Sequence, residues 1–251
     1  MKDSTTFLKI LKHIGIAVFW VGVWYIVAAL INKELFLPYP HTVAARFLTL
    51  CRTADFWKTT AVSLVRIIEG FLGGVAVGSA LALLTNYIRG TKAVIAPAIR
   101  AVRATPVVSF ILLAFLWLDN DTIPVVIALL MVVPIIWENL TAGFANLNPD
   151  LNEMARVFAL SKTKTFFKVI LPQLMPHLYS GCLVSLGLAW KSGIAAEVIS
   201  YPKIAIGQAM NDAKMTLETA DVLVWTVVVV VLSLILESFF KILIKKGGRR
   251  T

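Results

Sequence analysis

The chain contains several apolar runs long enough to cross a lipid bilayer, and this feature constrains its fold more than any other. The run at residues 222–244 carries only two charged side chains, Glu237 and Lys241. A helix of about 20 apolar residues crosses the hydrocarbon layer. Of all residues, 59% are hydrophobic and 15% are charged, whereas soluble domains are about 45–50% apolar. We therefore expect an all-α integral membrane protein.

About six transmembrane helices are predicted, in a single transmembrane domain that covers residues 1–251. The expected spans are residues 14–31, 61–87, 107–118, 123–137, 178–199 and 222–244. The third and fourth are short, so they form either two tilted spans or a re-entrant hairpin. Extending the third back through Ala104 and the fourth to Leu140 gives each enough length, and we favour two spans. Pro106, Pro124 and Pro134 are expected to kink or cap these helices.

The first apolar run is interpreted as a retained span rather than a signal peptide. It is longer than a usual signal-peptide core and has no A-x-A-like site before Asn32. The next segment, residues 37–60, contains Pro38 and Pro40 and then apolar residues at helical spacing. This pattern is typical of an interfacial helix, here on the outer surface.

Lys and Arg residues gather on one side of this topology. The expected cytoplasmic segments hold 16 of the 24 basic residues, and the expected outer segments hold 6. Cytoplasmic loops are enriched in Lys and Arg, so a multi-pass protein with both termini in the cytoplasm is predicted. The net charge of +10 follows largely from this bias and does not indicate a nucleic-acid partner.

A polar, basic segment at residues 148–172 lies between the fourth and fifth expected spans and is called here the 148–172 loop. Asn148 is suited to cap a helix, Pro149 to occupy its first position, and Asp150 to face the positive end of the helix dipole. Apolar residues then recur every three or four positions, at Leu151, Met154, Ala155 and Phe158. One amphipathic helix of about three turns is predicted.

A second helix is predicted in the same loop. Ser161 is suited to cap it, and Leu171 before Pro172 is expected to end it. Its apolar side comprises Phe166, Phe167, Val169 and Ile170. The 148–172 loop is therefore predicted to be a cytoplasmic helix-turn-helix.

This loop resembles the "EAA" loop of ATP-binding-cassette importer permeases, which reads E-A-A, three residues, G, nine residues, then I-x-L-P. The spacing fits without a gap, and the matching positions are Glu153, Ala155, Leu171 and Pro172. Val169 replaces Ile, whereas Met154 and Ala159 depart from Ala and Gly. Because Gly tolerates a left-handed backbone that Ala resists, we expect a differently shaped turn at Ala159.

Two further runs, at residues 97–118 and 186–197, resemble permeases of nitrate, sulfonate, taurine and hydroxymethylpyrimidine importers. The resemblance implies a subunit of the bacterial cytoplasmic membrane that works as a pair, most simply a homodimer. It further implies an extracytoplasmic solute-binding protein, two cytoplasmic ATP-binding subunits, and a small polar or anionic solute. Contacts with the ATPase are implied for nine residues of the loop, Glu153, Met154, Ala155, Arg156, Phe158, Ala159, Leu160, Leu171 and Pro172.

The sequence lacks any Gly-Lys dipeptide, so it contains no P-loop of the G-x-x-x-x-G-K-[ST] type. We therefore expect a transport subunit that is not an enzyme and holds no cofactor, with ATP and Mg in the partner ATPase. The alternatives are a secondary transporter or channel without an ATPase, for which no internal repeat is visible, and a membrane enzyme. Metal ligation is not expected, because the histidines and cysteines are scattered at His13, His41, Cys51, His177 and Cys182.

Two charges within the fifth expected span, Lys191 and Glu197, are candidates for the substrate path. Charged side chains at membrane depth usually face a cavity or a partner. One interpretation places Lys191 with Trp190 and Ser192 along the path and Glu197 at an outer gate. The other places Glu197 in water at the outer boundary and pairs Lys191 with a neighbouring span.

The second expected span carries two further features. Arg66 and Glu69 lie three residues apart and are expected to pair on the helix surface. Gly70, Gly74 and Gly78 recur every four residues and predict close helix packing, within or between subunits.

Overall fold

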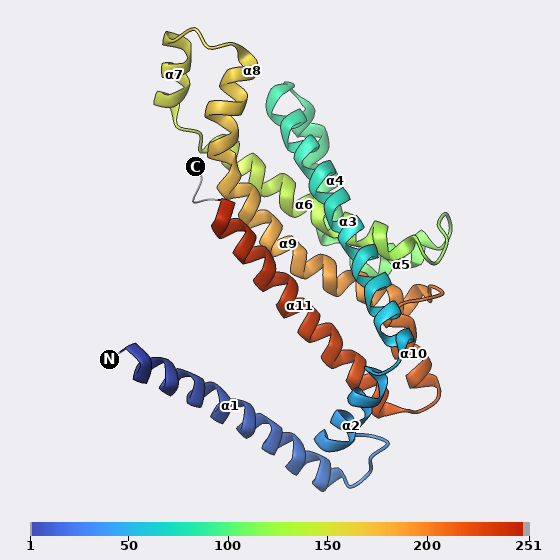
Figure 1. Cartoon of the computed structure of the whole chain (residues 1–251). Coiled ribbons are helices and arrows are strands. Elements are labelled where there is room, and N and C mark those ends of the chain that lie inside the picture. The colour runs from blue at the N-terminus through green and yellow to red at the C-terminus, as the bar shows by residue number, and fades with distance from the viewer. Residues whose placement is uncertain (1, 248–251) are drawn as a thin grey trace. The chain divides into compact units, whose positions relative to one another are not determined.

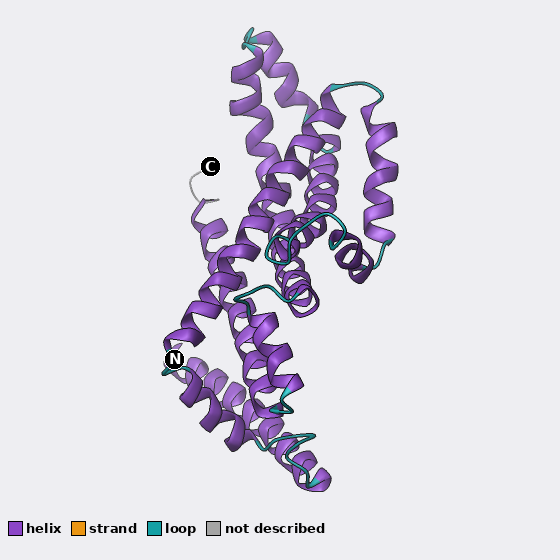
Figure 2. Cartoon of the chain, turned by 90° about the vertical axis from the view of Figure 1, so that its right-hand side faces the viewer, coloured by secondary structure: helices purple, strands orange, loops and turns teal. Residues whose placement is uncertain are grey.

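The computed structural model describes the backbone of residues 2–247 and the side chains of residues 15–242 and 244. Only helices and loops occur in these residues (Figure 1, Figure 2). The helices in chain order are α1 (Lys2–Ile31), α2 (Pro40–Leu50), α3 (Ala54–Tyr87), α4 (Thr91–Ala104), α5 (Val107–Ala114), α6 (Ile123–Ala145), α7 (Pro149–Val157), α8 (Lys162–Thr165), the π-helical turn η1 (Phe166–Ile170), α9 (Leu171–Ser200), α10 (Ile206–Met215) and α11 (Thr219–Gly247).

The all-α membrane prediction is confirmed. Four helical stretches are long and apolar enough to cross a membrane, namely Ala54–Tyr87, Ile123–Ala145, Lys162–Ser200 and Thr219–Ile242. The pair α4 and α5 adds a fifth if it is counted as one broken span. The first expected span corresponds to a shorter apolar stretch, Gly15–Ile31, at the end of α1.

The third expected span, residues 107–118 extended back through Ala104, is broken at Pro106, where a kink or cap was expected. The helix axis bends by 99° between α4 and α5, and α5 has only eight residues. Pro106 explains the break, because it lacks a backbone N–H and disfavours a helical conformation for Thr105, whose ψ is 130°. The fourth expected span is confirmed as α6, which includes the extension to Leu140 and continues to Ala145.

The chain divides into two compact units, residues 60–208 with 230–251 and residues 1–59 with 209–229. In the smaller unit, α2 lies where an interfacial helix was expected, although α3 already begins at Ala54. Arg46 on α2 forms a bidentate ion pair with Asp221 at the start of α11, with Nη2–Oδ2 at 2.8 Å. The indole Nε1 of Trp24 donates to the Pro38 carbonyl at 3.1 Å, so α1 and the following loop are joined as well.

In the larger unit, α3 and α6 approach each other closely along the glycine face of α3. A Cβ atom on Gly70 would lie 2.4 Å from the Val125 carbonyl oxygen, and one on Gly74 would lie 2.5 Å from the Val132 Cβ. A Cβ atom on Gly78 would lie 2.9 Å from the Ile136 Cβ of α6. The predicted close packing is therefore confirmed, and it lies within one subunit.

Helix α9 also packs along α6. Gly181 of α9 lies against Asn139, and Gly143 of α6 lies against His177. Near the far end of the pair, Ala196 joins a buried apolar cluster with Ile111, Ala114, Ile123 and Ile127. The two helices thus share small-residue contacts and a core from one end to the other.

The second helix of the 148–172 loop does not end at Leu171, as had been expected from Pro172. Instead α8, η1 and α9 form one helical stretch from Lys162 to Ser200. In the π-helical turn the Leu171 N–H donates to the Phe166 carbonyl, so the hydrogen-bond register changes just before Pro172 and the helix continues past a residue that lacks an N–H. The predicted cap is confirmed, since the Ser161 hydroxyl accepts from the Lys164 N–H.

Candidate functional site

The first helix of the 148–172 loop, α7, begins as the sequence predicts. The Asn148 side chain accepts a hydrogen bond from the Asp150 N–H at 2.9 Å, and Pro149 occupies the first turn. Asp150 lies in the first turn and Arg156 in the last, so both charges interact favourably with the helix dipole. Figure 1 shows α7 and α8 connected by a short loop beside the start of α9.

Most of the apolar side chains of α7 are exposed. Ala155 is only 2% exposed and faces the protein, where Val169 of η1 is also buried. By contrast, Val157 is 77% and Phe158 is 72% exposed. Leu151 and Met154 are also exposed, and so are the charged Glu153 and Arg156. A short helix thus presents both apolar and charged side chains away from its own protein.

The turn after α7 keeps a left-handed residue although glycine is absent. Ala159 has φ 50°. Its N–H donates to the Arg156 carbonyl, and the Leu160 N–H donates to the Ala155 carbonyl, both at 2.9 Å. These two bonds form the Schellman end of a helix. The expectation of a differently shaped turn is therefore wrong, because the two bonds hold Ala159 in the conformation that glycine would adopt.

The remaining residues predicted to contact an ATPase lie next to this helix pair. Leu160 and Leu171 are half-buried, and Pro172 is exposed. All nine residues therefore belong to one end of the larger unit.

The residues predicted for a substrate path are placed on different faces of α9. Trp190 is 1% exposed, and the buried Ser192 donates its hydroxyl hydrogen to the Leu188 carbonyl of its own helix at 2.8 Å. Lys191 lies on the exposed face of α9. Glu197 is fully buried on the opposite side, so the structure does not bring Lys191 and Glu197 together.

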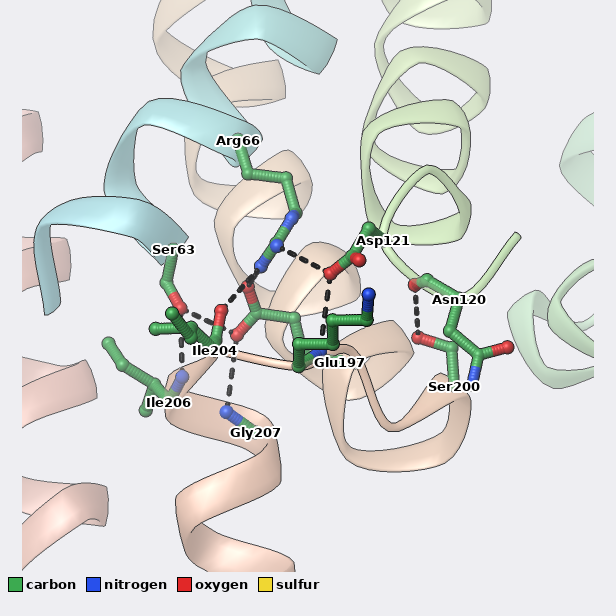
Figure 3. Close-up of polar contacts among 10 residues, drawn as sticks. Ser63, Arg66, Asn120, Asp121, Glu197, Ser200, Ile204, Ile206 and Gly207 are labelled. Carbon is green, nitrogen blue, oxygen red and sulfur yellow. Dashed lines mark hydrogen bonds and ion pairs between the residues drawn. The ribbon is translucent and has the colours of Figure 1, made fainter. Parts of the chain in front are cut away.

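Glu197 is the centre of a buried polar cluster, shown in Figure 3. One carboxylate oxygen accepts from Arg66 Nη1 at 3.0 Å, and the other accepts from the Ser63 hydroxyl at 2.8 Å. The placement of Glu197 in water at the outer boundary is therefore wrong. So is the expected pair of Arg66 with Glu69, because Arg66 turns instead toward Glu197 and Asp121.

The start of α10 is held by the same cluster. The Gly207 N–H donates to a Glu197 oxygen at 3.2 Å, and the Ile206 N–H donates to the Ser63 hydroxyl oxygen at 2.8 Å. The first N–H groups of a helix lack partners within that helix and attract negative charge. Gly207 is required by the fit, since a Cβ there would lie 2.4 Å from the Glu197 Cβ. Glu197 of α9 thus acts as a buried cap for α10.

Two more contacts bind the segment between α9 and α10. Asp121, just before α6, accepts from Arg66 Nη2 at 3.1 Å and from the Lys203 N–H at 3.2 Å. Arg66 also donates to the Ile204 carbonyl. We call the set Ser63, Arg66, Asp121 and Glu197 the charged anchor. It satisfies buried charges and backbone groups from four segments of the chain.

Sequence reasoning had not identified Ser63, Asp121 or the α10 start as partners of Glu197. Arg66 and Glu197 are separated by 131 residues, so no local spacing rule connects them. The available signal was the presence of two opposite charges near the same end of two expected spans, since charges at membrane depth seek partners.

Residues 74–247, more than half of the chain, match the family model "Binding-protein-dependent transport system inner membrane component". The chain is 32% identical over 208 residues to the putative aliphatic sulfonates transport permease protein SsuC of Escherichia coli strain K12, covering 81% of this chain and 78% of that protein. It is 25% identical over 236 residues to the taurine transport system permease protein TauC of the same organism, covering 91% and 86%.

A similar fold is found in solved structures. An amino acid ABC transporter crystallised with histidines contains a chain with a TM-score of 0.65 at 19% identity, covering 82% of this chain and 98% of that chain. The MetNI methionine ABC transporter in an inward-facing conformation gives a TM-score of 0.54 at 17% identity, covering 77% and 93%. The chain therefore belongs to the family of inner-membrane components of binding-protein-dependent transport systems, and it is a permease subunit of an ABC importer.

Proposed function

We propose that the 148–172 loop is the surface on which this permease receives a separate cytoplasmic ATPase. The observation that carries the proposal is the exposure of Val157 and Phe158 on a capped, dipole-matched helix outside the apolar spans. Exposed apolar side chains next to charged ones are typical of a helix that lies in a groove of a partner. The helix has nine residues, about 14 Å at 1.5 Å per residue, a length suited to such a groove.

The source of energy follows from the same argument. This chain has no P-loop, so ATP and Mg are expected to be held by the partner and not by the permease. Two ATP-binding subunits need two docking helices, and each copy of this chain supplies one. A homodimer with an isologous interface is the simplest assembly that supplies both.

The cargo is proposed to be a small polar or anionic solute delivered by an extracytoplasmic binding protein. The support is the similarity to permeases that are named for aliphatic sulfonates and taurine. The distribution of Lys and Arg supports a cytoplasmic position for the 148–172 loop and both termini.

Docking is tested by copurification of the ATPase with tagged permease. Glu153→Lys reverses an exposed charge on α7, and Ala155→Asp places a charge where α7 packs on its own protein. Both should reduce the amount of bound ATPase about tenfold or more, since a charge without a partner in a packed contact costs several kcal/mol. The control Glu34→Lys reverses an exposed acid outside the loop and should leave copurification unchanged. Full recovery of active ATPase with both loop variants would exclude this docking surface.

A further inference from the structure

An ion pair between Arg103 of α4 and Glu138 of α6 lies in the membrane-spanning part of the larger unit. The Nη1 atom of Arg103 donates to the Oε1 atom of Glu138. Glu138 lies about 11 Å before the end of α6 at Ala145, at 1.5 Å per residue. Arg103 lies in the last turn of α4, just before the break at Pro106. Both charges are therefore at membrane depth.

The rest of the chain does not cover this pair. The side chain of Arg103 is 54% exposed and that of Glu138 is 39% exposed. A charged side chain at membrane depth is costly in lipid, so it usually faces a water-filled cavity or a partner. The exposure of both members therefore argues against a purely internal ion pair.

The face of α6 around Glu138 differs from the helix faces that suit lipid. Helices α3 and α11 expose large apolar side chains, as at Leu72 and Leu234. Among the residues of α6, all of which the structure describes, only Ala142 and Ala145 are exposed. Both lie within about 40° of Glu138 around the helix axis. A strip of small and charged side chains is suited to water and a polar solute, and not to acyl chains.

We propose that Arg103 and Glu138 line the part of the translocation path nearer the 148–172 loop, and that Arg103 receives the anionic group of the solute. The planar fork of a guanidinium matches carboxylates and similar oxyanions. Glu138 pairs with Arg103 when no solute is present and competes with the solute for it. The anion is therefore held weakly enough to leave, as passage through a pore requires. This inference rests on the proposed anionic cargo, because a neutral solute has no charge for Arg103 to bind.

Access by water is tested with two thiol reagents in the permease–ATPase complex in lipid nanodiscs, in a Cys51→Ser, Cys182→Ala background. Sulfonatoethyl methanethiosulfonate is an anion, and trimethylammonioethyl methanethiosulfonate is a cation. Ile135→Cys places a thiol one turn from Glu138, at a half-buried position, and both reagents should modify it. The matched control is Val77→Cys on the exposed side of α3, since both positions lie about 15 Å before the end of their helices. It should react with neither reagent.

The ratio of the anionic to the cationic reaction rate reports the charge near position 135. Glu138→Gln should raise this ratio about threefold or more, and Arg103→Gln should lower it by a similar factor, because a nearby unit charge acts in opposite senses on the two reagents. Arg103→Lys keeps the charge and should leave the ratio near that of the parent. The double variant Arg103→Gln with Glu138→Gln should also return towards the parent ratio, which general structural damage would not do.

Contact between Arg103 and an oxyanion is tested with an excess of methanesulfonate, against sodium chloride at the same ionic strength. Methanesulfonate should slow modification of Ile135→Cys by the anionic reagent about twofold or more in Glu138→Gln, where the competing carboxylate is absent. The effect should be smaller in the parent and absent in Arg103→Gln.

Three results would overturn the inference in a complex that retains its ATPase. They are no reaction at Ile135→Cys or an equal reaction at Val77→Cys, a rate ratio that Glu138→Gln does not change, and no protection by methanesulfonate in Glu138→Gln. Import of only neutral or cationic solutes by the parent complex would instead refute the proposed cargo, and loss of the ATPase from the parent complex would refute the proposed docking. The thiol reaction rates depend on neither cargo nor docking, so these failures are distinguishable.

Discussion

Ala159 shows that a single residue can keep a backbone conformation against its own preference. A left-handed conformation costs a non-glycine residue about 1 kcal/mol, and here the two hydrogen bonds of the Schellman end hold it in place. At the residue scale, sequence predicted the caps of α7 and α8 because capping depends on neighbours within three positions. It did not predict the partners of Arg66, which depend on contacts across 55 and 131 residues.

The first residue-scale prediction concerns Ala159→Gly. The substitution removes the cost of φ 50° and should stabilise the turn by about 1 kcal/mol, without loss of ATPase binding. Ala159→Val should instead destabilise the turn, since a β-branched side chain resists this region more strongly. Protease resistance of the loop and copurification of the ATPase measure both effects. The control Ala98→Gly, at an exposed helical position of α4, should instead destabilise the protein by a similar amount. A loss of stability in Ala159→Gly would contradict this explanation of the turn.

At the scale of elements, apolar length and small-residue spacing were sufficient to predict most spans and the tight face of α3. Pro106 indicated a kink or cap between α4 and α5, and the helix axis bends there by 99°. Two other features escaped that reasoning, and each has a physical cause. The continuity of α8 with α9 depends on a π-helical turn that absorbs Pro172. Helix α10 has only ten residues, so no span-length signal marked it.

The element-scale prediction concerns Gly74. A Cβ there would meet the Val132 side chain at 2.5 Å and the Leu129 carbonyl at 2.9 Å, so Gly74→Ala must push α3 and α6 apart. We expect a loss of about 1–3 kcal/mol, which exceeds the gain in helix propensity of about 1 kcal/mol. Gly187→Ala on α9 has no atom within 4 Å and is the matched control. Thermal unfolding of the purified permease measures both, and equal melting temperatures would show that this helix contact is not tight.

At the scale of the whole molecule, the membrane orientation is a prediction that the two native cysteines can test. Cys51 lies just after α2, on the side expected to be outside, and Cys182 is 5% exposed within α9. A membrane-impermeant maleimide added to intact cells should therefore label Cys51 and leave Cys182 unmodified.

Desolvation raises the pKa of the Cys51 thiol, so less thiolate is present at neutral pH than in a free thiol. The labelling of Cys51 should thus be slow near pH 7. As the pH rises, its rate should still increase at a pH where the labelling rate of a free thiol is already constant.

The cytoplasmic side is probed by Lys164→Cys in a Cys51→Ser background. This exposed position in α8 should react with the same reagent only after the cells are permeabilised. The reason is that the 148–172 loop carries four basic residues and directly precedes the expected cytoplasmic end of α9. In the protein that retains Cys51, permeabilisation should not change the labelling of that residue. If position 164 reacts in intact cells and Cys51 does not, the orientation is inverted. The loop would then face away from any cytoplasmic ATPase.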